Sequence, residues 1–553
     1  MMVPIDGTAD RVTDDGVTAE RPPELVDVTE LLVRAQSGEA RAVLSQVDAL
    51  ETAATPQYAG PSFHDRAQWL RFARFVALHE LRIVGTADQV AAEMIRLAEP
   101  YDDRPWQALG YALRGQSLLL QRQFESAYDE LARSVVLLEE VDEINYQVGH
   151  ATNAAALTLG RLDLYELADE WLGRLNRAAE HLGDTMLRTL YAFNSVWLHL
   201  KWGFELDLIG DNSQAQRHYR LAVDGFESAP TGNGLVRDSA WPSEVTLHGS
   251  AARAMLGGGI ELENDLRKHL EVVAPTHRQE ATLTGHLALG KVYANEGDTI
   301  RAMEELEVAC AAGATLPRLQ IPAARAYAAY ADLLRQRSGS SPVAEAYAEL
   351  TSRLLRDRWD ERRGRVTSFE DRLTHERARD ELRRRAAAYL TDPLTGLGNR
   401  RQIEIRLPEL LLESAAAGRP LSVAFADIDD FKSVNDDLSH LAGDGLLREL
   451  SQQMRALLDP ADVLARFGGE EFVIVLPDRT AEAAYRTMDQ MRTQVQQRVW
   501  RSLPGDRRIT ITIGLAESWD GASRTQMLAA ADKAMLEAKR SGKNRVSIHQ
   551  HRG

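Results

Sequence analysis

Arg466-Phe467-Gly468-Gly469-Glu470-Glu471-Phe472 is a glycine pair followed by a carboxylate pair inside an apolar hairpin. The residues on either side, 462–467 and 472–476, predict two short β-strands. Adjacent glycines supply the positive φ that a tight turn between strands needs. A turn needs no acids, however, and two glutamates at the mouth of a buried strand are costly unless a cation or hydrogen-bond donors meet them. The stretch therefore predicts either solvated glutamates after a turn or one half of a cation site.

A second acidic element precedes this hairpin. The apolar run 423–426 leads directly into Asp427 and Asp429, and the helix-like stretch after it carries Asn435 and Asp444. Carboxylates at a strand end, facing carboxylates of a neighbouring hairpin, form the oxygen-rich arrangement that holds Mg²⁺ beside nucleotide phosphates. Two such elements in one domain favour a metal site over two unrelated groups of surface acids.

Together these motifs resemble a diguanylate cyclase domain of the GGDEF class, in its GGEEF variant. The resemblance covers 391–549 and rests on five blocks in order: DPLTGLGNR at 392–400, the segment 427–444, RFGGEEF at 466–472, TIG at 512–514, and ADKA at 531–534 leading to AKRSGKNR at 538–545. It implies an α+β, palm-like nucleotidyl cyclase fold. The pattern agrees, with strands expected at 421–426, 509–513 and 546–549 around the hairpin, and helices at 431–458, 481–499 and 525–540.

The resemblance implies that two GTP molecules condense into cyclic di-GMP, releasing two pyrophosphates, across a dimer of such domains. The implied cofactor is Mg²⁺ or Mn²⁺, two ions per active site, and the implied ligands are Asp427, the backbone carbonyl of Ile428, and Glu470. Either Glu470 or Glu471 would assist deprotonation of the attacking 3′-hydroxyl, and the sequence does not decide between them.

Six residues match positions at which the family binds GTP. These are Asn435 and Asp444 at the guanine, His440 in the pocket, and Lys432, Lys539 and Lys543 at the triphosphate. A carboxylate at the guanine is chemically sensible, because guanine presents N–H donors at N1 and N2 that adenine lacks. The alternatives are a structural role for His440 and a solvated charge at a helix end for each lysine.

The sequence departs from the family at its product-inhibition motif. Many members carry Arg-x-x-Asp shortly before the glycines, whereas the window here is Asp459-Pro460-Ala461-Asp462, with Asp459 in place of the arginine. An acid there repels the phosphates of the product. We therefore expect this product-inhibition site to be absent.

Composition sets the wider limits. The chain of 553 residues is too long for one core, has a formal net charge of −17 and contains one cysteine, Cys310. The charge argues against nucleic acid as a partner, the single cysteine suits a reducing compartment, and no apolar run predicts a membrane span. The acidic, Pro- and Gly-containing stretch 1–24 is expected to be a disordered leader, and the protein to be cytoplasmic.

Residues 25–352 predict an all-α region in which a loose repeat recurs. The offsets of Gly290, Tyr293, Gly297, Ala302 and Leu306 return around Gly203 and again around Gly115. Small residues at such offsets let two antiparallel helices approach closely. The pattern resembles tetratricopeptide repeats, although its copies are more widely spaced, and a solenoid of this kind presents a surface to a protein or peptide partner. The alternative is a generic helical domain rich in alanine.

The connector 353–390 predicts one helix with a heptad seam. We define the seam as Leu355, Trp359, Arg362, Val366, Phe369 and Leu373. A parallel coiled coil through this seam would place two catalytic domains, 391–553, in a homodimer. The alternative is a last amphipathic helix packed on the solenoid.

The prediction from sequence is a diguanylate cyclase regulated by its helical repeats. The alternative is a catalytically silent GGDEF module that acts as a receptor for GTP or cyclic di-GMP, or as a scaffold. The intact acidic pair and the missing product-site arginine both favour the enzyme. The sequence does not identify the activating signal, the repeat partner or the sign of the regulation.

Overall fold

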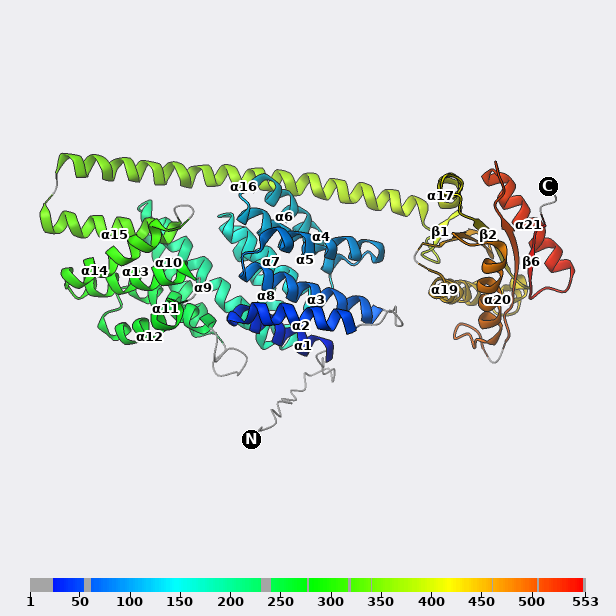
Figure 1. Cartoon of the computed structure of the whole chain (residues 1–553), viewed down its shortest axis with the longest axis horizontal. Helices are drawn as coiled ribbons and strands as arrows, with labels where there is room; N and C mark the ends of the chain where they lie inside the picture. Colours follow the sequence, from blue (N-terminus) through cyan, green and yellow to red (C-terminus); the bar gives the residue numbers. More distant parts are fainter. Residues whose placement is uncertain are drawn as a thin grey trace, which may run out of the picture. The chain divides into compact units, whose positions relative to one another are not determined.

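A computed structural model describes residues 23–53, 61–229, 240–275, 278–316, 320–339, 341–459, 461–504 and 507–550. The chain divides into two compact units, Met1–Arg377 and Ala378–Gly553 (Figure 1). The predicted leader lies almost wholly outside the described residues. Among the described residues, no helix is both long and apolar enough to cross a membrane.

The first unit is built from α-helices, with short 3₁₀ or π turns between some of them. In chain order the α-helices are α1 (Pro23–Arg34), α2 (Ala40–Ala53), α3 (Pro61–Glu80), α4 (Val84–Ala98), α5 (Arg104–Leu120), α6 (Phe124–Glu139), α7 (Tyr146–Arg161), α8 (Tyr165–Leu182), α9 (Thr185–Leu208), α10 (Asn212–Glu227), α11 (Ala240–Met255), α12 (Glu263–Val273), α13 (Gln279–Asn295), α14 (Thr299–Ala314) and α15 (Ile321–Ser338).

The recurring small residues do what the repeat pattern predicts. A Cβ added at Gly290 would lie 2.6 Å from Cγ of Leu306, and one added at Gly203 would lie 2.5 Å from Cε1 of Tyr219. These glycines therefore let α13 pack closely on α14, and α9 on α10. Gly297, with φ of +80°, makes the turn between α13 and α14. The all-helical prediction is confirmed, whereas assignment to tetratricopeptide repeats stays a prediction.

Helix α16 (Pro342–Leu390) is 49 residues long and contains the predicted connector. Its seam faces the first unit: Phe369 is fully buried, Leu373 and Arg362 nearly so, and Trp359 and Val366 pack against the same core. Figure 1 shows α16 running beside α6. In a single chain the seam thus packs on the helical unit, as in the alternative considered above, and pairing between two copies stays a prediction.

Gly364 lies on the exposed side of α16, where an added Cβ would meet nothing within 4 Å. Gly364→Ala is therefore expected to stabilise the helix by roughly 0.5–1 kcal/mol, because alanine loses less backbone entropy there. Differential scanning calorimetry should show the first unit melting about 1–2 °C higher. Gly297→Ala, at a positive φ, is the matched control and should lower the same transition. A downward shift for both variants would contradict the prediction.

The second unit contains one mixed, six-stranded sheet of order β1-β3-β4-β2-β5-β6. Its strands are β1 (Gly398–Asn399), β2 (Leu421–Ile428), β3 (Val463–Gly468), β4 (Glu471–Pro477), β5 (Ile511–Glu517) and β6 (Val546–Ile548). The two edge pairs, β1 with β3 and β5 with β6, are parallel, and the three central pairs are antiparallel. The predicted α+β class is confirmed.

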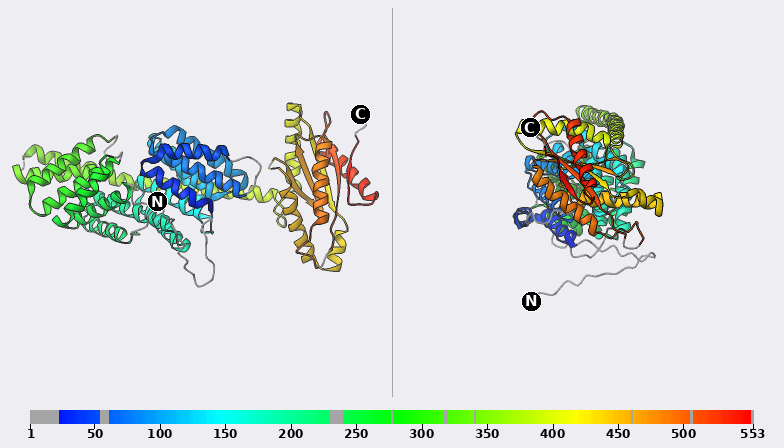
Figure 2. Two further views of the ribbon diagram at one scale, coloured as in Figure 1. Left: turned by 60° about the horizontal axis from the view of Figure 1, so that its bottom comes forward. Right: turned by 90° about the vertical axis from the view of Figure 1, so that its right-hand side faces the viewer.

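Helices cover both faces of this sheet (Figure 2). The helices are α17 (Arg400–Ala417), α18 (Phe431–Asp437), α19 (His440–Ala456), α20 (Ala481–Gln497) and α21 (Arg524–Arg540). Alternate residues of β2 point to opposite faces: Ala424 and Ala426 meet α19 and α20, while Val423 and Phe425 meet α17 and α21. β2 is consequently buried along its whole length.

Several boundaries differ from the sequence prediction. The strand expected at 509–513 begins at Ile511 and continues to Glu517. Its pairing with β2 extends over that whole length, and its side chains up to Leu515 lie in the core. The helical stretch 431–458 is two helices, and Ser439 begins the second by accepting a hydrogen bond from the amide of Ala442 at 3.2 Å. Strand β1 and helix α17 were not predicted.

Candidate active site

Two strands bring the acidic residues to one end of the sheet. Asp427 is the last residue but one of β2 and lies opposite Glu471 of β4 on one side and Thr512 of β5 on the other. Gly469, with φ of +52°, forms the β3–β4 turn that precedes Glu470. The amide of Ile428 donates to the carbonyl of Glu470 at 3.3 Å, which joins the turn to the end of β2. The two predicted acidic elements are therefore adjacent.

The carboxylate of Asp427 is buried among charges of both signs. Its side chain is about 8% exposed, and its Oδ1 lies 2.8 Å from Nζ of Lys539 on α21. Burial raises the pKa of Asp427, the bond from Lys539 lowers it, and Glu470 and Asp429 raise it again. Burial is the largest cause of this raised pKa, and a buried carboxylate beside two further acids suits a cation in addition to Lys539.

Glu471 belongs to the same acidic group. Burial raises its pKa, as do the charges of Asp427, Asp532 and Glu470, while Lys539 opposes them. Asp532 of α21 was quoted from the sequence only as part of a family block, and no role was assigned to it. Helix α21 therefore contributes a carboxylate, Asp532, as well as an ammonium group, Lys539, to this end of the sheet.

The donor set fits a magnesium ion that binds together with a nucleotide. Within the described residues, no three His, Cys, Asp or Glu side chains converge as a metal site. The predicted ligands are instead two carboxylates, Asp427 and Glu470, and the carbonyl of Ile428. All three are hard oxygen donors, and Mg²⁺ in phosphate-handling sites commonly takes one or two carboxylates and completes its shell with water and phosphate. These residues therefore fit the predicted ion.

Asp429, which follows the same strand, has a structural role. It accepts hydrogen bonds from the hydroxyl of Thr510 at 2.7 Å, the hydroxyl of Thr512 at 2.6 Å and the amide of Asn544 at 3.1 Å. These donors satisfy the carboxylate and join the end of β2 to β5 and to the loop before β6. Asp427 and Asp429, two residues apart in the sequence, thus have different surroundings in the fold.

The predicted guanine-binding residues lie on the helical pair α18 and α19. Gly443 permits this packing, since a Cβ added there would lie 2.0 Å from Oδ1 of Asn435. Asn435 is thereby held against the turn of α19 that carries Asp444, and both side chains are half-buried. His440 is exposed at the first position of α19. The structure brings Asn435 and Asp444 together, while their roles stay predictions.

The three predicted phosphate-binding lysines have different surroundings. Lys539 contacts Asp427, as described, and Lys543 lies 2.6 Å from Oδ1 of Asp430. Asp430 is itself at a positive φ where β2 turns into α18. Lys432 is exposed in the first turn of α18. Lys539 and Lys543 thus lie beside the end of β2.

An ion pair that was not predicted from the sequence links Asp392, the second residue after α16, to the glycine turn. Arg466 of β3 contacts both carboxylate oxygens of Asp392, at 3.2 and 3.3 Å, and its Nε donates to the carbonyl of Gly469 at 2.8 Å. Asp392 also accepts from the amide and hydroxyl of Thr395. The partners are far apart in the sequence, so spacing gave no signal.

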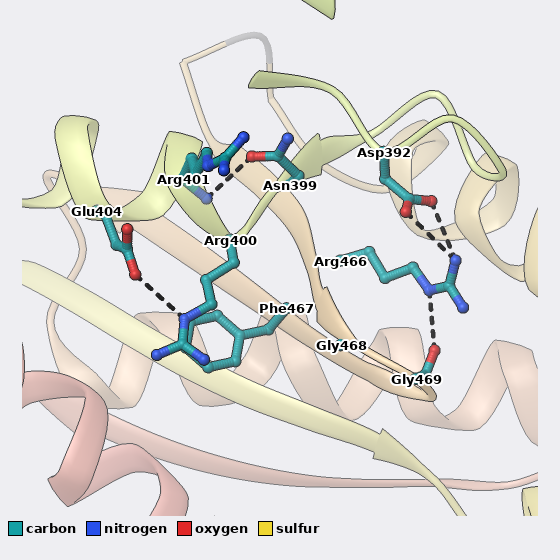
Figure 3. A pocket seen from close by; sticks show the side chains of 9 residues that line it. All are labelled: Asp392, Asn399, Arg400, Arg401, Glu404, Arg466, Phe467, Gly468 and Gly469. Carbon is teal, nitrogen blue, oxygen red and sulfur yellow. Dashed lines mark hydrogen bonds and ion pairs between the residues drawn. The ribbon is translucent and has the colours of Figure 1, made fainter. Parts of the chain in front are cut away.

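These groups border a pocket of about 530 Å³, whose lining residues are drawn in Figure 3. Arg400 lies over the ring of Phe467, 4.8 Å from its centroid, and pairs with Glu404. The full lining consists of Asp392, Asn399, Arg400, Arg401, Glu404, Arg466, Phe467, Gly468 and Gly469. None of these nine residues is a predicted metal ligand or GTP-binding residue, although Gly468 and Gly469 belong to the turn that leads to Glu470.

The two acids of the product-inhibition window, Asp459 and Asp462, pair with an arginine that lies outside the window. Arg479 pairs with Asp459 and lies 3.1 Å from Oδ2 of Asp462. Arg455 donates to the backbone carbonyl of Asp462 at 2.9 Å. Arg479 carries one positive charge against these two carboxylates, so it offsets their negative charge only in part. The absence of a product-inhibition site stays a prediction.

The second unit is similar to proteins of a known family. Residues 389–545 match the family described as "Diguanylate cyclase, GGDEF domain". "Diguanylate cyclase DgcP" of Pseudomonas aeruginosa is 36% identical over 186 residues, 33% of this chain and 27% of that protein. "Response regulator PleD" of Caulobacter vibrioides is 34% identical over 160 residues, 28% of this chain and 35% of that protein.

A solved structure is also similar. The GGDEF domain of DgcB from Caulobacter crescentus, in complex with c-di-GMP, is 33% identical and covers 29% of this chain and 96% of that one, with a TM-score of 0.29. The chain spans only about a third or less of the length of the two relatives above, so their likeness concerns this region alone. The chain therefore carries a GGDEF domain after a helical amino-terminal unit.

Proposed function

We propose that this protein is a diguanylate cyclase that condenses two GTP molecules into cyclic di-GMP and two pyrophosphates. The observation that carries the proposal is the meeting of Asp427 and the Glu470–Glu471 pair at one end of the sheet, with a lysine beside them. The name of one reported relative, "Diguanylate cyclase DgcP", agrees with this activity.

Each of the two condensations is a phosphoryl transfer between the nucleotides of two subunits. The 3′-oxygen of one GTP forms a bond to the α-phosphorus of the other, the bond from that phosphorus to the bridging oxygen of the β-phosphate breaks, and pyrophosphate leaves. The proton of the 3′-hydroxyl passes to a base, for which Glu470 and Glu471 are the candidates. The raised pKa of Glu471 makes it a better proton acceptor than an ordinary carboxylate.

The other residues bind and orient the nucleotide. Asp444 and Asn435 would hold the guanine edge, and Lys539 and Lys543 would neutralise the triphosphate. Asp427, Glu470 and the carbonyl of Ile428 would hold Mg²⁺, which supplies charge neutralisation at the reacting phosphate when bound. Positioning and charge neutralisation provide most of the catalysis in reactions of this kind.

The reaction requires two such domains, so we infer a homodimer. We also infer that the helical unit binds a protein or peptide partner and regulates the cyclase, because solenoid-like helical arrays provide extended surfaces for such partners.

The test is product formation from GTP and Mg²⁺ by the full-length protein over a range of protein concentrations. A specific rate that rises with protein concentration is expected, since each active site needs a second subunit. Product formation with a constant specific rate would contradict the dimer requirement. GTP or cyclic di-GMP binding without turnover at any concentration would instead support a receptor.

A further inference from the structure

The seam of α16 is occupied in this structure by the chain's own helical unit. The ring of Phe369 is fully buried and lies 6.0 Å from the ring of Tyr128 on α6. Leu373, one turn further along, is 5% exposed. Trp359 contacts both hydrophobic clusters of the helical unit. The side chains that a coiled coil would use as knobs are therefore already packed against the helical unit.

Acidic residues of the helical unit hold the same helix. We define the acidic dock as Glu125, Asp129, Glu139, Asp163, Glu166 and Glu205. Its centre pairs Arg362 with Glu166 through two hydrogen bonds, at 2.6 and 2.9 Å, while Arg358 reaches Oδ2 of Asp163 at 2.9 Å. The guanidinium of Arg362 also stacks 4.1 Å from the ring of Trp359.

The acidic dock continues towards the end of the first unit. Arg372 donates to Asp129 at 3.0 Å, and Arg377 contacts both carboxylate oxygens of Glu139, at 2.9 and 2.7 Å. The side chain of Arg377 is 50% exposed, whereas that of Arg362 is 5% exposed. Since exposed ion pairs contribute little, Arg362, whose buried guanidinium donates twice to Glu166, contributes more to docking than Arg377 does.

We propose that the acidic dock and a second copy's α16 compete for the seam, and that only the undocked seam forms the dimer that makes cyclic di-GMP. This inference rests on the proposed function. A helix presents one apolar stripe, so residues buried against the helical unit cannot also pack against another copy of the chain. The docked arrangement would then be the inactive one.

The docked α16 and the α16 pair each have an unfavourable free-energy term, so a small change can shift the equilibrium between them. The buried Nε atoms of Arg362 and Arg365 have no hydrogen-bond acceptor among the described residues, so docking leaves donors unsatisfied. In a parallel α16 pair, two copies of Arg362 would face each other in one layer of the core, where like charges weaken the pairing. A partner of the helical unit that prefers one arrangement would therefore shift the population.

The test uses full-length Arg362→Leu, which removes the buried arginine that binds Glu166 and adds an apolar seam residue. Sedimentation velocity is expected to show the dimer dissociation constant falling at least about tenfold, a shift of the size that differential binding of one state can produce. Arg353→Leu is the matched control on the same helix, since Arg353 is 71% exposed and pairs within α16 with Glu349. It should behave as the parent protein.

A second readout reports the seam directly. In a Cys310→Ser background, Val366→Cys introduces the chain's one thiol, and mild oxidation should yield a disulfide-linked dimer with Arg362→Leu and little with Arg353→Leu. A parent protein that already links quantitatively through position 366, or an Arg362→Leu protein that stays monomeric, would overturn the proposal. Increased dimer without any product would support competition for the seam while refuting the cyclase.

Exchanging the charges of Glu166 and Arg362 distinguishes loss of this ion pair from misfolding of a single variant. The side chain of Glu166 is 53% exposed, so Glu166→Arg should fold and should release α16 as Arg362→Leu does. Adding Arg362→Glu restores an oppositely charged pair and should return the protein to the monomer. Failure of the double variant to reverse the effect of Glu166→Arg would contradict a role for this ion pair.

Discussion

Glu470→Ala is expected to lower the rate of cyclic di-GMP formation by a factor on the order of 10³ or more. The variant removes one of the two carboxylates predicted to hold the metal, and a factor of that size corresponds to ~4 kcal/mol of transition-state stabilisation. Because the side chain follows a turn made by Gly469, its removal should leave the fold intact. The measurement is the initial rate of product formation at saturating GTP and Mg²⁺.

Glu537→Ala is the matched control, since this exposed glutamate lies on α21 of the same unit. It should retain the parent rate. Circular dichroism spectra and thermal transitions of both variants should match those of the parent protein. A Glu470→Ala protein that keeps more than about a tenth of the parent rate would be inconsistent with a metal-binding role for this carboxylate.

The acidic centre could be predicted from sequence because its geometry is local. The apolar run that ends at Asp427 predicts a buried strand, and the glycine pair before Glu470 predicts a hairpin turn. Pairing of the two strands then places Asp427 opposite Glu471 in the structure. The family resemblance supplied the roles that pattern alone does not give.

Contacts between distant segments could not be predicted in the same way. Asp392 and Arg466 carry no periodic signal, and their pairing becomes visible only when β1 lies beside β3. The hydrogen bonds of Asp429 were equally unpredictable, because one of their donors, Thr512, comes from β5. Neighbouring acids look identical in a sequence, whereas hydrogen-bond donors in the fold separate a structural carboxylate from one available to a cation.

The seam of α16 shows a different limit of sequence patterns. An apolar stripe at steps of four and three residues predicts that one face of a helix is buried, without saying what buries it. Both a coiled coil and docking on the helical unit satisfy that pattern. In this structure of one chain the seam is docked, and the acids that meet the arginines of α16 come from α6, α8, α9 and the turn before α8.

Gly514→Val is expected to prevent stable folding of the second unit. Gly514 lies in β5, opposite Phe425 of β2, where α21 crosses the sheet. A Cβ at this position would lie 2.0 Å from the amide nitrogen of Met535 and 2.1 Å from the carbonyl oxygen of Ala531. Both are backbone atoms of the helix, so no side-chain rotation can make room. Overpacking that must move a helix costs more than about 4 kcal/mol, a large part of the stability of a domain.

Calorimetry of the full-length protein distinguishes this local failure from general misfolding. With Gly514→Val, the transition of the second unit should be lost or lowered by more than about 10 °C, while that of the helical unit remains. Gly468→Ala is the control, because its added Cβ meets nothing within 4 Å and should leave both transitions in place. Since α21 carries Lys539 beside Asp427, displacement of the helix should also remove cyclase activity. A Gly514→Val protein with an unchanged second transition would show that α21 does not rest on the backbone of β5.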